Sequence, residues 1–127
     1  MKKIFLVLIF STISNSVFAE WTLIQTNDEG NLYVDFDTLK KSGDTASVDT
    51  LTNFYNRQDK NELSSKWREM YDCKTKRFKA LSIEYFAENM GQGSVIESTA
   101  FDAATTSWTS LVQYSVGELK SNIICSR

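Results

Sequence analysis

The stretch that decides the fold runs from Lys66 to Gly93 and reads KWREMYDCKTKRFKALSIEYFAENMGQG. An aromatic-rich run leads into Cys73, a basic turn follows at residues 74–76, and a second apolar run ends in a glycine-containing loop. Alternating runs on either side of a short polar turn are typical of a β-hairpin. We therefore expect antiparallel strands at residues 63–73 and 77–86. The alternation puts Trp67, Tyr71 and Cys73 on one side of the first strand and Lys66, Arg68 and Met70 on the other.

The second strand of this hairpin changes phase. Leu81, Ile83 and Tyr85 share one face, whereas Phe78 and Ala80 are out of phase with them. A β-bulge, or a strand buried on both faces, would explain the change. The loop Gly91-Gln92-Gly93 lacks the strand-to-helix context of a phosphate-binding loop, because the residues after it resemble a strand. It is interpreted as a tight turn that needs positive φ angles.

The flanking segments complete the sheet. Residues 21–25 and 31–36 are expected to form a first hairpin, and residues 37–41 a turn or a single helical loop. The other assignments are a strand at 46–55, an exposed connection at 56–61, a last short strand at 95–98 and an irregular crossing at 99–109. Ser115 and Glu118 have the spacing of a capping box, and Leu119, Ile123 and Ile124 recur at helical spacing. The predicted fold is α+β: about six antiparallel strands with a C-terminal helix packed on them.

The N-terminus has the features of an export signal. Two lysines precede the apolar run at residues 4–10, and the small residue Ala19 follows a polar segment. We expect residues 1–19 to be a cleaved signal peptide and residues 20–127 to be one domain. The apolar run is too short to span a membrane, so no transmembrane segment is expected after cleavage. The sequence predicts an exported protein, located in the periplasm or at the cell surface.

Export would place the two cysteines in an oxidising compartment, where they can form a disulfide. Cys73 and Cys125 are the only cysteines, and an oxidising compartment favours a disulfide between them. A bond closing so long a loop is worth about 4 kcal/mol in the chain-entropy account. A metal-binding or reactive thiol pair has no supporting histidine or Cys-x-x-Cys spacing.

Composition excludes several functions. Without Lys2 and Lys3 the chain carries 12 basic and 16 acidic residues, which argues against nucleic-acid binding. The absence of histidine excludes Ser-His-Asp and Cys-His catalysis and histidine-ligated metals. A Ser-Lys pair has no motif to mark it, and Asp35 with Asp37 is interpreted as a solvated turn rather than a cation site. No cofactor and no enzymatic activity are predicted.

Basic residues are concentrated in the central hairpin. Half of the 12 fall within 14 positions, interleaved with Trp67, Tyr71 and Phe78. They could be a solvated surface that discourages edge-to-edge aggregation, or a docking surface for an acidic partner such as a matrix protein or a sulfated polysaccharide. The candidate partner-binding residues are Lys66, Trp67, Arg68, Lys74, Lys76, Arg77 and Lys79.

Several short motifs also occur in a characteristic order. They are Trp21, Tyr33-Val34-Asp35, Tyr71-Asp72-Cys73, Leu81-Ser82, Tyr85, Met90-Gly91-Gln92-Gly93, Trp108 and Ile123-Ile124-Cys125. In this order the mature chain resembles the surface-adhesin protein E family of bacterial exported proteins. The resemblance implies an antiparallel sheet, a C-terminal helix and a Cys73–Cys125 disulfide.

The same resemblance suggests a function. The family is named for adhesins that bind host vitronectin and laminin, through a segment that corresponds to residues 63–73. It implies that Lys66 and Arg68 contact a host matrix protein. The alternative is a soluble periplasmic structural or accessory protein that binds another envelope component, and a homodimer is left open.

Overall fold

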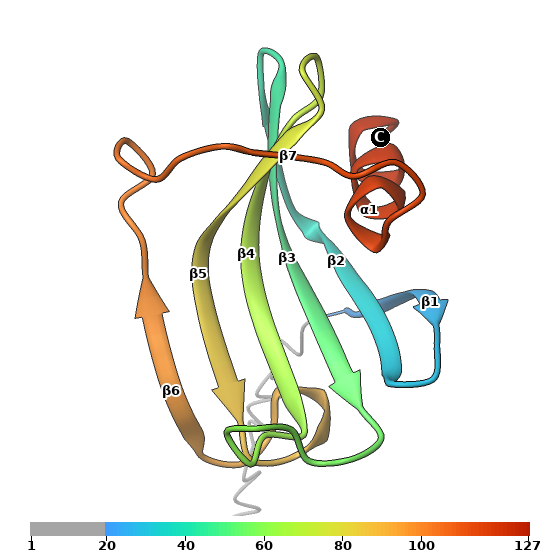
Figure 1. Ribbon diagram of the computed structural model, residues 1–127, viewed down its shortest axis with the longest axis vertical. Helices are drawn as coiled ribbons and strands as arrows, with labels where there is room; N and C mark the ends of the chain where they lie inside the picture. Colours follow the sequence, from blue (N-terminus) through green and yellow to red (C-terminus); the bar gives the residue numbers. More distant parts are fainter. Residues whose placement is uncertain (1–19) are drawn as a thin grey trace, which may run out of the picture.

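The structure, a computed structural model, describes residues 20–127 and consists of one antiparallel sheet with a helix on one side (Figure 1). Six strands follow one another in sequence order, β1 to β6, and the short β7 pairs with β5. The elements are β1 (Thr22–Thr26), β2 (Gly30–Ser42), β3 (Thr45–Phe54), β4 (Ser64–Asp72), β5 (Arg77–Phe86), β6 (Val95–Ala100), β7 (Thr109–Ser110) and α1 (Val116–Cys125). The predicted fold class is confirmed, with β7 as an additional strand at the end of the expected crossing. The predicted signal peptide lies outside the described residues.

The central hairpin forms as the sequence indicates. Strand β4 pairs with β5 from Ser64–Phe86 to Asp72–Arg77, around the turn at residues 73–76. The register shifts between Arg68 and Glu69, which face Ser82 and Ala80, so Leu81 is the extra residue of a β-bulge. The bulge explains the change of phase. In the following loop Gly91 and Gly93 have φ angles of 69° and 77°, which confirms the predicted tight turn.

The expectation of a turn or helical loop at residues 37–41 is wrong, because β2 continues through them to Ser42. The register with β3 jumps between Asp35 and Lys40, so this part of β2 bulges out of the ladder. Thr38 stabilises the bulge: its hydroxyl Oγ1 donates to the Asp35 carbonyl and accepts from the Asp49 amide at 2.8 Å. Asp35 is buried and its carboxylate accepts the Asp37 amide, so it does not lie in a solvated turn. Here hydrogen bonds from side chains to the backbone replace the bonds between strands. Alternation of apolar and polar residues in the sequence cannot reveal this replacement.

The helix α1 covers only part of one face of the sheet, which we call the helix face. Ser115 is its N-cap and accepts the Glu118 amide at 3.2 Å, and the Glu118 carboxylate accepts the Tyr114 amide. This arrangement is close to the predicted capping box. Ile124 is fully buried against Val34, Val48 and Tyr71, at the centre of the core. No helix in the described part has the length and apolar character that crossing a bilayer requires.

The disulfide joins the helix to the hairpin. The sulfurs of Cys73 and Cys125 are 2.03 Å apart and the Cα atoms 5.7 Å, which confirms the predicted bond. A buried ion pair adds a second link, since Lys120 Nζ lies 2.9 and 3.0 Å from the Glu69 carboxylate oxygens. Thr50 and Tyr71 also donate to that carboxylate, so its charge is fully compensated. The two links fix α1 over the upper part of the sheet.

Candidate functional site

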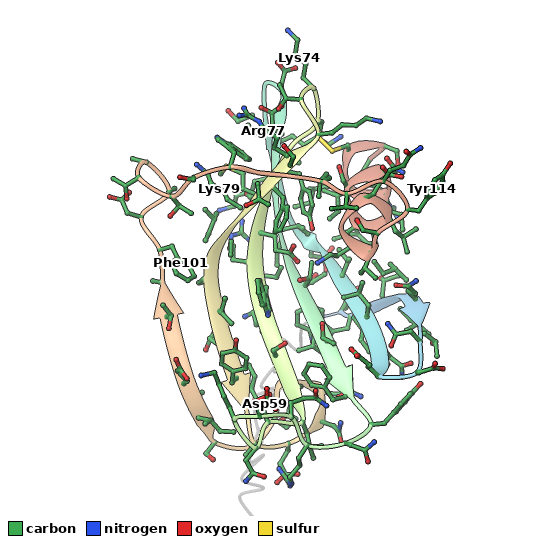
Figure 2. All side chains as sticks on the ribbon, in the orientation of Figure 1. Asp59, Lys74, Arg77, Lys79, Phe101 and Tyr114 are labelled. Atoms are coloured by element: carbon green, nitrogen blue, oxygen red, sulfur yellow. A yellow bond between two sulfur atoms is a disulfide. The ribbon has the colours of Figure 1, made fainter. Side chains whose placement is uncertain are left out.

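The predicted basic residues occupy three different environments, and only the hairpin tip is open. Lys74 and Lys76 are exposed at the β4–β5 turn, where Figure 2 shows Lys74 at the extreme end of the molecule. The Asp72 carboxylate fixes the turn by accepting the amides of Lys74 at 3.1 Å and Thr75 at 3.0 Å. The Thr75 amide is the main reason that the pKa of Asp72 lies below its usual value. Lys76 has a left-handed φ of 54°, so the turn presents both lysines from a defined backbone.

Arg77 and Lys79 pack against the segment that crosses from β6 to the helix. The Arg77 guanidinium lies 3.4 Å from Asp72 Oδ2 and 5.5 Å from the Trp108 ring. Lys79 is only 8% exposed; its Nζ donates to the Ala103 carbonyl at 2.6 Å and lies 4.3 Å from the same ring. Lys79 therefore anchors the crossing segment through a hydrogen bond and a cation–π contact. Its charge is directed into the protein rather than toward a partner.

Lys66 and Arg68 lie on the face opposite the helix face, because they alternate with the residues that pack below α1. Both approach Asp49: Lys66 Nζ is 3.7 Å and Arg68 Nη1 3.0 Å from its carboxylate oxygens. Arg68 also donates to Ser47 Oγ at 3.1 Å. Trp67 lies between them in sequence but contributes to a groove on the helix face. The structure thus separates Trp67 from its two basic neighbours by the thickness of the sheet.

Sequence reasoning missed basic residues that the fold brings to the hairpin tip. Figure 1 shows the β2–β3 and β4–β5 turns side by side, and the Cys73 amide donates to the Asp44 carbonyl at 2.8 Å. Lys40 and Lys41 come from the end of β2, and Lys41 Nζ donates to the carbonyls of Cys125 and Arg127. We call this region the basic end. Its charged residues are Lys40, Lys41, Lys74, Lys76, Arg77 and Arg127, against Asp44 and Asp72.

Two signals could have indicated these residues. Lys40 and Lys41 are adjacent in sequence, but the expected turn at 37–41 hid their position at the end of a long strand. Arg127 follows the disulfide-bonded Cys125, so the disulfide already places it near the hairpin tip. Its guanidinium lies 3.9 Å from the Phe36 ring. A cluster formed from three chain segments depends on pairing that composition alone does not reveal.

The buried polar groups hold the fold together rather than forming a reactive centre. Glu69 is 1% exposed and bonded to Thr50, Tyr71 and Lys120. Burial, followed by repulsion from the Glu69 carboxylate, raises the pKa of Tyr71 far above its usual value, so this hydroxyl remains a donor. Within residues 20–127 no three acidic or cysteine side chains come together as a metal site would require.

These features define a small disulfide-linked sheet-and-helix domain with a basic end. The family model described as surface-adhesin protein E matches residues 21–126, and the chain belongs to that family. No curated protein matches the sequence.

Two solved structures of protein E from Haemophilus influenzae share the fold. Crystal form II is 17% identical, with a TM-score of 0.60, covering 82% of this chain and 87% of that one. Protein E from a non-typeable strain is 16% identical, with a TM-score of 0.56, covering 82% of this chain and 75% of that one. At this identity the likeness concerns the fold, and the family match carries the surface-adhesin assignment.

Proposed function

We propose that this protein is an exported, non-enzymatic adhesin that binds an acidic region of a host matrix protein of the vitronectin or laminin class. The observation that carries the proposal is the basic end. Lys74 and Lys76 are exposed on a rigid turn, beside basic residues from β2 and the C-terminus. A cluster of like charges on an otherwise acidic chain attracts an acidic surface and orients the encounter. Membership of a surface-adhesin family supports the same class of partner.

The seven candidate partner-binding residues of the central hairpin would contribute unequally to the contact with the partner. Lys74 and Lys76 would make direct contacts, because their side chains are exposed and no ion pair is found for them among the described residues. Lys66 and Arg68 would contribute less, since both share Asp49 as a counter-charge. The contact surface would therefore be the tip of the central hairpin more than its strands.

Binding to immobilised vitronectin and laminin over a salt series tests this function. The variant Lys74→Glu/Lys76→Glu should lose most of the binding at low salt, and wild-type binding should fall as salt rises, because screening shortens the reach of exposed charges. Lys66→Glu/Arg68→Glu should have a smaller effect. The control is Lys60→Glu, an exposed lysine in the loop between β3 and β4. Absence of binding at low salt, or equal losses in all three variants, would contradict the proposal.

We also propose display at the cell surface, which separates an adhesin from the periplasmic alternative. Protease added to intact cells should remove a surface protein and spare a periplasmic one. Complete protection on intact cells, with digestion after the outer membrane is opened, would favour the envelope accessory role instead.

A further inference from the structure

A groove of about 520 Å³ lies on the helix face beside the N-terminal part of α1, which contributes Val116, Gly117 and Lys120 to its lining. Its floor comes from the strands and includes Phe54 and Trp67, while its wall comes from the segment that leads into the helix. Hydroxyl and amide side chains alternate with these rings. On the strands and the β1–β2 turn, the uncharged polar lining residues are Asn27, Asn31, Thr50, Thr52 and Ser65, and Thr109, Ser110 and Ser115 add hydroxyls from the opposite wall. The volume is within the usual range for binding sites, and the mixture of rings and hydrogen-bonding groups suits a peptide with its own amides.

The wall of the groove exposes apolar side chains from a fixed loop. Val112 is 70% exposed and lines the groove, and the next turn presents Tyr114, which is 90% exposed (Figure 2). Tyr114 has a left-handed φ of 62°, a conformation that costs free energy for a residue with a side chain. The loop is held by bonds from the Ser115 amide and hydroxyl to the Val112 carbonyl. An exposed tyrosine on a preorganised turn, next to an exposed apolar valine, is a feature of protein-binding surfaces.

The charges at the groove favour a cationic partner. Glu29 lines the groove, and Asp28 precedes it in the same exposed turn between β1 and β2. Neither carboxylate has an ion-pair partner among residues 20–127. The one lysine in the lining, Lys120, is neutralised by Glu69. The groove is therefore acidic on one wall and apolar on the other.

We propose that this groove binds an extended segment of another protein in which an apolar side chain adjoins a lysine or arginine. The apolar side chain packs between Trp67 and Val112, and the neighbouring basic group reaches Glu29 and Asp28. The site is on the side of the sheet opposite Lys66 and Arg68, and its partner has the opposite charge from the one expected at the basic end. It is independent of the adhesin function proposed above.

Heteronuclear NMR titration of the exported protein tests the groove with three blocked peptides. They are Gly-Lys-Phe-Lys-Gly, Gly-Glu-Phe-Glu-Gly and Gly-Lys-Ala-Lys-Gly. The basic phenylalanine peptide should shift the Trp67 indole signal and the amides of Thr52 and Ser65 in a saturable way. The other two should bind at this site at least about fivefold more weakly, because each lacks one of the two complementary features.

Two variants at exposed positions test the charge and the apolar contact separately. Glu29→Lys should reverse the preference between the basic and acidic phenylalanine peptides, and Val112→Glu should weaken the apolar contact while leaving the melting temperature unchanged. Asp59→Lys, an exposed acidic residue in the β3–β4 loop, is the matched control and should leave all three affinities unchanged.

Three outcomes would overturn the inference. One is the absence of saturable shifts at the groove, and another is equal binding of the acidic and basic peptides there. The third is a set of groove shifts that depends on protein concentration without peptide, which would assign the surface to self-association.

Discussion

The upper and lower halves of the helix face use the same strands but differ in what covers them. In the upper half Val48 and Tyr71 are completely buried beneath Ile124 of α1. In the lower half Phe54 and Trp67 are only partly buried and line the groove. Figure 1 shows α1 beside the upper part of the sheet, away from the lower parts of β3 to β5. Identical alternation in a strand thus produces a packed core in one place and an open surface in another.

This difference shows where the stability of the domain is concentrated. The disulfide, the Lys120–Glu69 ion pair and the buried Ile124 all act on the upper half. Because α1 has only ten residues, it would be marginal as an isolated helix and depends on these contacts. We therefore expect changes in the upper half to cost stability and changes in the lower half to alter binding.

The largest effect should come from removing the disulfide that holds α1 on the upper half of the sheet. Replacing Cys73 and Cys125 together by serine should lower the free energy of unfolding by about 4 kcal/mol, because the unfolded chain regains the entropy of an open loop. Urea denaturation of the oxidised parent and the double variant measures the difference. The reduced parent is the control and should resemble the variant; equal stability of all three would show that the bond does not support the upper half.

A pair of alanine variants compares the two halves directly. Ile124→Ala should cost about 3 kcal/mol, since it leaves a cavity in the packed half. Val116→Ala, in the first turn of α1 where it borders the groove of the lower half, should change stability by less than about 0.5 kcal/mol, because that side chain is exposed and alanine favours a helix. Urea midpoints of the two variants give the comparison. Similar losses would mean that the lower half is also part of the core.

Alkaline titration should affect the upper half through Tyr71. Burial raises the pKa of its hydroxyl, so the folded protein keeps a proton that the unfolded chain loses near pH 10.0. The stabilising contribution is complete below that pH and is lost above it, by about 1.4 kcal/mol per pH unit. Tyr71→Phe removes this titration, so its stability should fall less steeply above pH 10.0. Parallel slopes for parent and variant would contradict the assignment.

A modest effect should come from the helix cap at the boundary between the halves. Ser115→Ala removes the acceptor for the Glu118 amide and should cost about 1 kcal/mol. Thermal unfolding measures it, with Ser107→Ala in the exposed crossing segment as the control. If both variants melt at the same temperature, the cap does not help to hold α1 on the sheet.

The sequence alone determined the elements whose causes are local. Alternation in residues 63–86 specified the central hairpin and a change of phase in its second strand. The two glycines specified the turn after it, and Ser115 with Glu118 specified the start of the helix. Each depends on side-chain periodicity or on a backbone preference of one or two residues. The disulfide also followed from the sequence, because only two cysteines exist in an exported chain.

Only the tertiary structure decided how those elements combine into surfaces. The bulge at Thr38 extended β2 and brought Lys40 and Lys41 to the basic end. Lys79, which the sequence grouped with Lys74 and Lys76 of the central hairpin, became a buried anchor. Trp67 was separated from Lys66 and Arg68 because successive residues of a strand face opposite ways. The position of α1 left Trp67 in an open groove and enclosed Tyr71 in the core. Which part of a strand α1 packs against depends on contacts between residues far apart in the sequence. No local pattern in the strand encodes those contacts.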